Sequence, residues 1–91
     1  MVEIHFNSDS IAWSKDMTSN RFFVLHQIEY MREKLLNNGY LYLNDVYEAF
    51  GVKWTPDNEN VCFRKEDEFK PIFEMHEDEI IIKIEGERHV N

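Results

Sequence analysis

Carboxylates are the side chains whose spacing first suggests chemistry in this sequence. Within Glu74–Glu79, four acids and one histidine lie in six residues. Such oxygen and imidazole groups can hold a divalent cation or act as general acid and base. The acids of 77–79 are consecutive, with no glycine and no neutral oxygen ligand between them. We therefore expect a solvated turn here, and keep a small cation-binding or catalytic site over 74–79 as an alternative.

The histidines and the single cysteine add no metal or catalytic motif. Zinc sites need closely spaced ligands, and that spacing is absent from the only candidates: His5, His26, His76, His89 and Cys62. Cys62 lies between Val61 and Phe63, so we predict a buried, unreactive thiol. Three scattered glycines cannot form a phosphate-binding loop. We therefore expect a protein that is not an enzyme and has no metal and no cofactor.

A second run of acids, at 66–68, belongs to the same acidic half of the chain. Residues 57–91 hold eleven acids and five bases, whereas residues 1–56 hold seven and five. We predict that the two runs form an exposed acidic face that binds a basic protein surface, by imitating the spacing of phosphates. The residues predicted to contact this partner are Glu66, Asp67, Glu68, Glu77, Asp78 and Glu79.

Tyr40 and Tyr42 alternate with Leu41 and Leu43 in a short segment that we expect to be extended. Side chains of a strand point alternately to its two faces, so buried leucines would leave both tyrosines in solvent. Because tyrosine is enriched at protein interfaces, we add Tyr40 and Tyr42 to the partner-binding residues. The alternative is that their rings only pack on the flank of a helix.

Two helices precede the acidic half. Apolar residues at helical spacing predict a helix over 21–38, begun by Thr18, Ser19 or Asn20 and ended by Gly39 in the left-handed conformation. After the segment 40–43, Asn44 or Asp45 is expected to cap a short second helix. Asp45 with Glu48 has the spacing of a capping box, and Gly51 follows the last turn.

Strands complete the predicted fold. Residues 2–6 alternate between apolar and polar types, as do segments beginning near Val61, Ile72 and Ile80. Short connections between the last three favour an antiparallel meander. We predict one α+β domain over 1–91, in which an N-terminal strand and two helices pack on a C-terminal three-stranded antiparallel meander. Residues 86–91 are expected to be a loose tail.

The link after the first helix also carries a resemblance. Residues 38–47 (Asn-Gly-Tyr-Leu-Tyr-Leu-Asn-Asp-Val-Tyr), then Gly51 and Trp54-Thr55-Pro56, resemble a group of short uncharacterised phage and prophage proteins of Gram-positive bacteria. The similarity covers roughly Leu25 to Ile84, and its sharp part is under twenty residues. It implies the same order of helix, link, short helix and strands. It brings no catalytic residues.

Composition limits the function. The longest apolar runs have four residues, far short of the ~20 that a membrane span needs, and the N-terminus lacks the pattern of a secretory signal. A net charge of −8 opposes direct nucleic-acid binding. We expect a cytoplasmic, non-catalytic phage-type accessory protein that binds a basic partner and inhibits a host nucleic-acid-handling or defence protein. The alternative is a virion or assembly component that forms homo-oligomers through its tyrosines.

Overall fold

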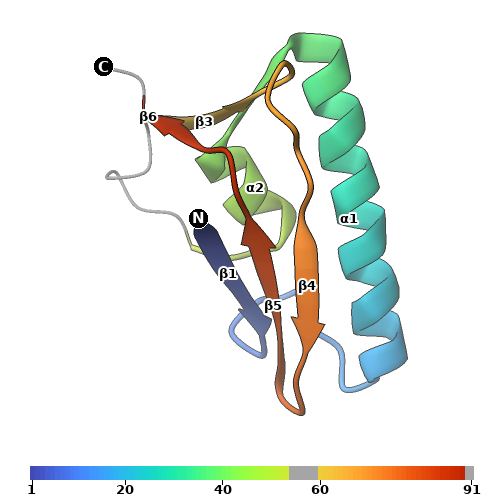
Figure 1. The fold of residues 1–91 in the computed structure, drawn as a ribbon. Coiled ribbons are helices and arrows are strands. Elements are labelled where there is room, and N and C mark those ends of the chain that lie inside the picture. Colours follow the sequence, from blue (N-terminus) through green and yellow to red (C-terminus); the bar gives the residue numbers. More distant parts are fainter. Residues whose placement is uncertain (54–59, 90–91) are drawn as a thin grey trace.

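The computed structural model describes residues 1–53 and 60–89, which form two helices and two antiparallel sheets (Figure 1). The predicted α+β class, with an N-terminal strand, then helices, then strands, is confirmed. The elements are β1 (Val2–Asn7), α1 (Met17–Asn38), β2 (Tyr40–Tyr42), α2 (Leu43–Ala49), β3 (Val61–Arg64), β4 (Ile72–Met75), β5 (Glu79–Ile84) and β6 (Arg88–His89).

The first sheet has the strand order β1-β5-β4. Val2 of β1 lies opposite Ile84 of β5, and Ile72 of β4 lies opposite Lys83 of β5. In β1 and β5 the apolar residues alternate with polar or less buried ones, so one face of the sheet joins the core. The other face carries charged and polar side chains together with Ile72 and Ile81.

The second sheet has the order β2-β3-β6, and it corrects the predicted meander. Of the three strands predicted to form the meander, only β4 and β5 form a hairpin, because β3 pairs with β2 and β6 instead of β4. Seven residues separate β3 from β4, enough chain to cross from one sheet to the other. In this connection Phe69 packs edge-on against Phe63, with 5.5 Å between ring centroids, which anchors the crossing in the apolar interior.

Helix α1 begins earlier than the sequence predicted. Asp16 is its N-cap: its carboxylate accepts a hydrogen bond from the backbone N–H of Thr18 at 3.0 Å. Asn20, an expected cap, is buried inside the helix, where its amide bonds to both the N–H and the carbonyl of Ser14 at 2.8 Å. The end of the helix is as predicted, with Gly39 in the left-handed conformation (φ 84°) and its N–H bonded to the carbonyl of Leu35.

Helix α2 is held at both ends by hydrogen bonds. The carboxylate of Asp45 accepts the backbone N–H of Tyr42 at 3.2 Å, which places the helix start slightly before the predicted caps. After the helix, Gly51 has φ 66°, and a Cβ at this position would lie 2.5 Å from Oγ of Ser10. That hydroxyl donates to the carbonyl of Phe50 at 2.7 Å. The loop after β1 and the end of α2 are therefore joined.

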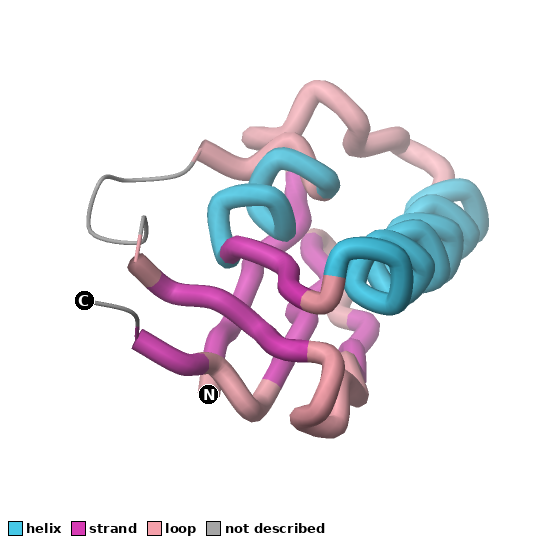
Figure 2. The backbone as a smooth tube through the Cα atoms, turned by 90° about the horizontal axis from the view of Figure 1, so that it is seen from above, coloured by secondary structure: helices cyan, strands magenta, loops and turns pink. Residues whose placement is uncertain are grey.

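The core lies between the helices and the sheets. The apolar residues whose helical spacing predicted α1 are buried in a stripe along the helix: Val24, Ile28, Met31 and Leu35. Seen from above, α1 and α2 lie side by side (Figure 2). An aromatic cluster closes one end of the core: the ring of Phe6 lies 5.1 Å from that of Phe23 and 5.2 Å from that of Trp13. Packing of apolar faces thus fixes both sheets relative to the helices.

Part of the segment that was expected to be a loose tail, residues 88–89, forms a strand. Arg88 and His89 form β6 and pair with Cys62 and Val61 of β3. The guanidinium of Arg88 also bonds to both carboxylate oxygens of Asp67, at 2.6 and 2.7 Å. This contact could not be predicted from local sequence, because its partners lie 21 residues apart. Val90 and Asn91 are outside the described residues.

Candidate interaction surface

The outer face of the β2–β3–β6 sheet carries the most distinctive group of side chains in the described part of the chain. Strand pairing places Tyr40 opposite Arg64 and Tyr42 opposite Cys62. The backbone of Lys65 donates to the carbonyl of Gly39 at 3.0 Å, which extends this pairing to the end of α1. Tyr40, Tyr42 and Glu66 line one shallow cavity of about 290 Å³. We call these three residues the tyrosine surface.

Both tyrosines face outward, as the alternation predicted. Tyr40 is 48 % exposed and Tyr42 44 %, whereas Leu41 and Leu43 are buried. The two rings meet edge to face with centroids 5.2 Å apart, a favourable geometry for aromatic pairs. The rings therefore support each other on a hydrogen-bonded sheet, and the predicted exposure does not depend on a flexible loop.

Cys62 is buried, as predicted, but it is not a member of the main cluster of packed apolar side chains. Its neighbours Val61 and Phe63 belong to the core cluster, and Cys62 does not. Strand alternation turns its thiol to the outer face, where it lines the same cavity as the tyrosines. Its exposure is only 3 %, and Tyr42 and Arg88 lie opposite it on the two neighbouring strands.

The acidic run at 66–68 lies beside the tyrosine surface, but its charges are largely paired. Asp67 is bound to Arg88, and this hydrogen bond holds the pKa of the Asp67 carboxyl below its usual value. Glu68 lies 3.1 Å from Lys70. The carboxylate of Glu66 lies 3.9 Å from the guanidinium of Arg64, farther than in the other two pairs, and it is well exposed. Glu66 is therefore the acid of this run that remains open to a partner beside the tyrosines.

The second acidic run, at 77–79, lies at the other end of β4, in the hairpin that leads to β5 (Figure 1). The structure therefore does not gather the six predicted acids on one face. Glu79 bonds to Nδ1 of His5 at 3.1 Å and lies 3.5 Å from the amide of Asn7. The hydrogen bond to His5 is the main cause that lowers the pKa of Glu79.

Two of the acids considered for a cation site are bound to basic side chains. Nζ of Lys83 donates to Glu74 at 3.0 Å; this bond lowers the pKa of Glu74 and raises that of Lys83. Glu79 is bound to His5, as above. Within residues 1–53 and 60–89, no three His, Cys, Asp or Glu side chains are grouped so that they could hold a metal ion.

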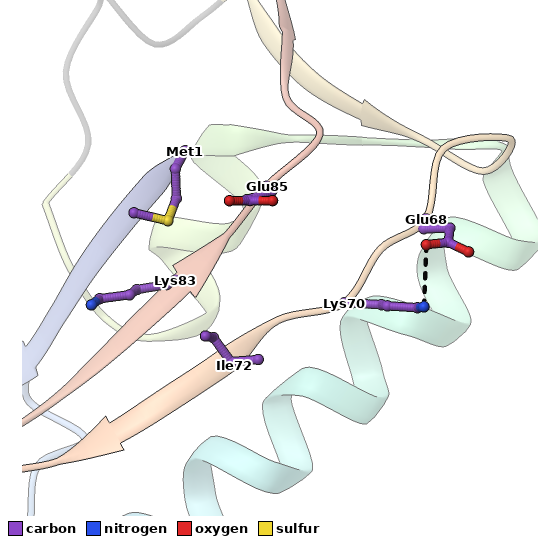
Figure 3. A pocket seen from close by; sticks show the side chains of 6 residues that line it. All are labelled: Met1, Glu68, Lys70, Ile72, Lys83 and Glu85. Atoms are coloured by element: carbon purple, nitrogen blue, oxygen red, sulfur yellow. Dashed lines mark ion pairs between the residues drawn. The ribbon is translucent and has the colours of Figure 1, made fainter.

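A further cavity of about 280 Å³ opens on the outer face of the first sheet (Figure 3). Its walls carry two lysines, two acids and two apolar side chains: Lys70, Lys83, Glu68, Glu85, Met1 and Ile72. Lys70 is paired with Glu68, and Lys83 with Glu74. Three of the four charged side chains that line the cavity are therefore paired, and Glu85 has no ion pair within the described residues. Both apolar side chains of the cavity are exposed, and one of them, Ile72, belongs to the edge strand β4.

Neither helix of the described residues has the length and apolar composition needed to cross a bilayer. The fold and this surface define a small α+β domain that presents an aromatic sheet face. A family model matches residues 4–85, and the chain belongs to that family, the family of unknown function DUF6353. Comparisons with curated proteins and with solved structures gave no match. Of the residues that carried the phage-protein resemblance, 54–56 lie outside the described residues.

Proposed function

We propose that this protein is a non-catalytic interaction module that binds a basic segment of a partner protein through the tyrosine surface. The observation that carries this proposal is the exposed, mutually packed pair of Tyr40 and Tyr42 on a paired strand. A surface of this kind loses little conformational freedom on binding, because strand pairing already fixes the backbone beneath it.

The chemistry of the tyrosine surface favours a cationic side chain. The face of a tyrosine ring attracts an ammonium or guanidinium group by roughly 0.5–2 kcal/mol, more when water is excluded. Glu66 lies at the same cavity and is held only loosely by Arg64. An arginine or lysine of the partner can therefore stack on a ring and approach this carboxylate. Asp67 has a different role, since it binds Arg88.

Net charge adds long-range selection to this local chemistry. The chain carries 18 acids and 10 bases, so a basic protein is attracted and a nucleic acid is repelled. Glu77 and Asp78 contribute to this field from the far end of β4. Because they lie apart from the tyrosines, we assign them to steering of the approach and not to the contact.

The setting of this function is part of the proposal. The resemblance of residues 38–47 to phage and prophage proteins supports a phage-encoded accessory protein in the cytoplasm of the host. Nucleic-acid-handling and defence proteins present basic surfaces, so we propose them as the class of partner that is inhibited. Genes encoding family members that cluster with small early-expressed phage genes would support this setting, and a chromosomal housekeeping neighbourhood would oppose it.

Capture from host lysate tests the tyrosine surface directly. The Tyr40→Ala/Tyr42→Ala variant is expected to lose the partner, whereas Tyr30→Ala, which removes a similarly exposed tyrosine from α1, is expected to retain it. Capture should weaken between low and high salt, because the contact is partly ionic. Equal capture by all three proteins, or capture that does not respond to salt, would contradict the proposal.

A second pair of variants separates contact from steering. Glu66→Gln is expected to speed dissociation of the partner, since it removes a carboxylate at the contact. Glu77→Gln/Asp78→Asn is expected to slow association and leave dissociation unchanged. Surface plasmon resonance with the captured partner distinguishes the two effects. Identical changes for both variants would show that the acids act only through net charge.

A further inference from the structure

The free edge of β4 is a separate feature, on the other sheet from the tyrosine surface. β4 is the last strand in the order β1-β5-β4, so one side of its backbone has no neighbouring strand. Its side chains are poorly covered: Ile72 is 60 % and Met75 43 % exposed. An open edge with exposed apolar side chains is a template for pairing with another strand.

The direction of the free backbone groups follows from the hairpin. The N–H of His76 bonds to the carbonyl of Glu79 at 2.9 Å, and the register continues with Glu74 opposite Ile81 and Ile72 opposite Lys83. In an antiparallel pair, hydrogen-bonded residues alternate with those that point away. The N–H and carbonyl groups of Phe73 and Met75 therefore point to the free edge, together with the carbonyl of Pro71.

The free N–H and carbonyl groups of β4 can pair with the same groups of β4 in a second copy of the chain. If two β4 strands pair antiparallel about a twofold axis with Phe73 opposite Phe73, each Phe73 N–H reaches the other Phe73 carbonyl. Each Met75 N–H then reaches the Pro71 carbonyl of the other copy. All four hydrogen bonds use existing donors, because this register needs only the carbonyl of Pro71 and not the N–H that proline lacks.

The side chains fit the same register. On the outer face Ile72 lies opposite Glu74 of the second copy, and Lys70 lies opposite His76, close to the acidic turn at 77–78. A register centred on Glu74 would oppose two carboxylates. A register centred on Ile72 would pair Phe73 with Pro71, so the bond that proline cannot donate would be missing next to the twofold axis; in the register centred on Phe73 it is missing only at Met75, farther from the axis. The register centred on Phe73 therefore avoids the opposed carboxylates and keeps both hydrogen bonds nearest the twofold axis.

We propose that the protein forms a symmetric dimer in which β4 pairs with β4 of a second copy, centred on Phe73. The strand order of the joined sheet is β1-β5-β4-β4-β5-β1. Because each copy contributes only a four-residue strand, the contact is small and the dimer is reversible and dependent on concentration. This dimer does not use the tyrosine surface, so it stands or falls independently of the proposed function.

Sedimentation velocity across a wide concentration range tests the dimer. The wild type is expected to shift from monomer to dimer as concentration rises. Met75→Pro is expected to stay monomeric, because it removes a donor at the free edge and no hydrogen bond to β5. Tyr40→Ala/Tyr42→Ala is the matched control and is expected to dimerise normally. Circular dichroism of each variant verifies folding.

Charge reversal and cross-linking test the register. Lys70→Glu is expected to weaken the dimer, and Glu77→Lys/Asp78→Lys in the same chain is expected to restore it. A mixture of the Ile72→Cys and Glu74→Cys proteins is expected to form the mixed disulfide in preference to either homodimer, since directly opposed residues lie close enough to bridge.

Three results would overturn the inference. One is a wild-type protein that remains monomeric at the highest concentration. Another is a dimer that persists in folded Met75→Pro and is lost in the tyrosine variant. The third is preferential cross-linking of Ile72→Cys to itself, which would place the twofold axis at a different residue. A dimer that is unaffected by Lys70→Glu would also contradict the proposed register, because that register brings Lys70 close to the acidic turn of the second copy.

Discussion

At the scale of single residues, contacts distant in sequence decide the positions that local patterns leave open. Alternation alone predicted that Tyr40 and Tyr42 face solvent, because the period of a strand is a local property. The pairing of Asp67 with Arg88 depends instead on β6 lying beside β3. For this reason the sequence could place Asp67 in an acidic run, but could not show that its charge is already matched.

The close approach of Gly51 to Ser10 predicts an unusually costly glycine substitution. Gly51→Ala is expected to destabilise the fold by about 2–3 kcal/mol, since positive φ and a steric clash act together. Gly39→Ala, also at positive φ but facing open space, is expected to cost about 1–2 kcal/mol. Urea unfolding of both variants measures the difference.

The same contact can be isolated by removing the hydroxyl. In a Ser10→Ala background the closest atom to the new Cβ is gone, so the additional cost of Gly51→Ala should fall toward that of Gly39→Ala. Ser10→Ala itself is expected to cost about 1–3 kcal/mol, because it leaves the buried carbonyl of Phe50 without its partner. Strict additivity of the two substitutions would contradict this explanation.

The Asp67–Arg88 pair predicts a specific dependence of stability on pH. The folded-state pKa of Asp67 is lowered, so the pair stabilises the protein above the pKa of Asp67 in the unfolded chain. This contribution is lost as pH falls through the lower folded-state pKa. Asp67→Asn is therefore expected to be less stable than wild type at neutral pH and equally stable in strong acid.

Thermal unfolding at a series of pH values measures this difference. Glu68→Gln is the matched control, because Glu68 belongs to the same acidic run and its pair with Lys70 is largely exposed to solvent. The control is expected to follow the wild type at every pH. A deficit of Asp67→Asn that stays constant down to strong acid would assign its effect to packing and not to charge.

At the scale of elements, the sequence was most informative where one segment determines its own structure. The end of α1 at Gly39 and its buried stripe were predicted correctly, because both depend on residues of the helix itself. The start was predicted too late. Three residues that often cap helices follow Asp16: Thr18, Ser19 and Asn20. The Asn20 side chain instead bonds to the backbone of Ser14, a contact that the local sequence does not reveal. Strand pairing was harder to predict, because the alternation of residues in β3 indicates a strand but does not show which other strands lie beside it.

The observed cap makes a prediction that separates Asp16 from its neighbours. Asp16→Ala is expected to destabilise the protein by about 1 kcal/mol, since it leaves the N–H of Thr18 without its acceptor. Thr18→Ala is expected to change stability by only a few tenths of a kcal/mol, because Thr18 already lies within the helix. Chemical denaturation compares the two. The reverse order would move the helix start back to the predicted position.

At the scale of the whole molecule, charge is distributed and not concentrated. The sequence correctly placed most acids in the C-terminal part, but it could not show that β4 holds the two runs apart or that Lys70, Lys83 and Arg88 neutralise several of them. A face formed by all six acids was therefore the wrong geometry. What remains is a general negative field around a local aromatic surface.

This field predicts how stability responds to salt. With a net charge of −8, repulsion among acids opposes the compact state, and added salt screens it. The unfolding temperature is expected to rise as sodium chloride increases from millimolar to a few hundred millimolar. The Glu77→Gln/Asp78→Asn variant should respond less, because it carries less repulsion. A temperature that falls with salt would mean that the ion pairs outweigh the repulsion.

The position of Cys62 gives the molecule a natural reporter. One sulfur atom, on the outer side of a sheet yet shielded by its two neighbouring strands, reacts with an alkylating probe at a rate set by how often that shield opens. Chemical labelling of Cys62 in the unmodified chain thus measures how often these strands open locally. A bound protein should slow the labelling of Cys62 without any engineered tag, and loss of the pairing between β6 and β3 should accelerate it.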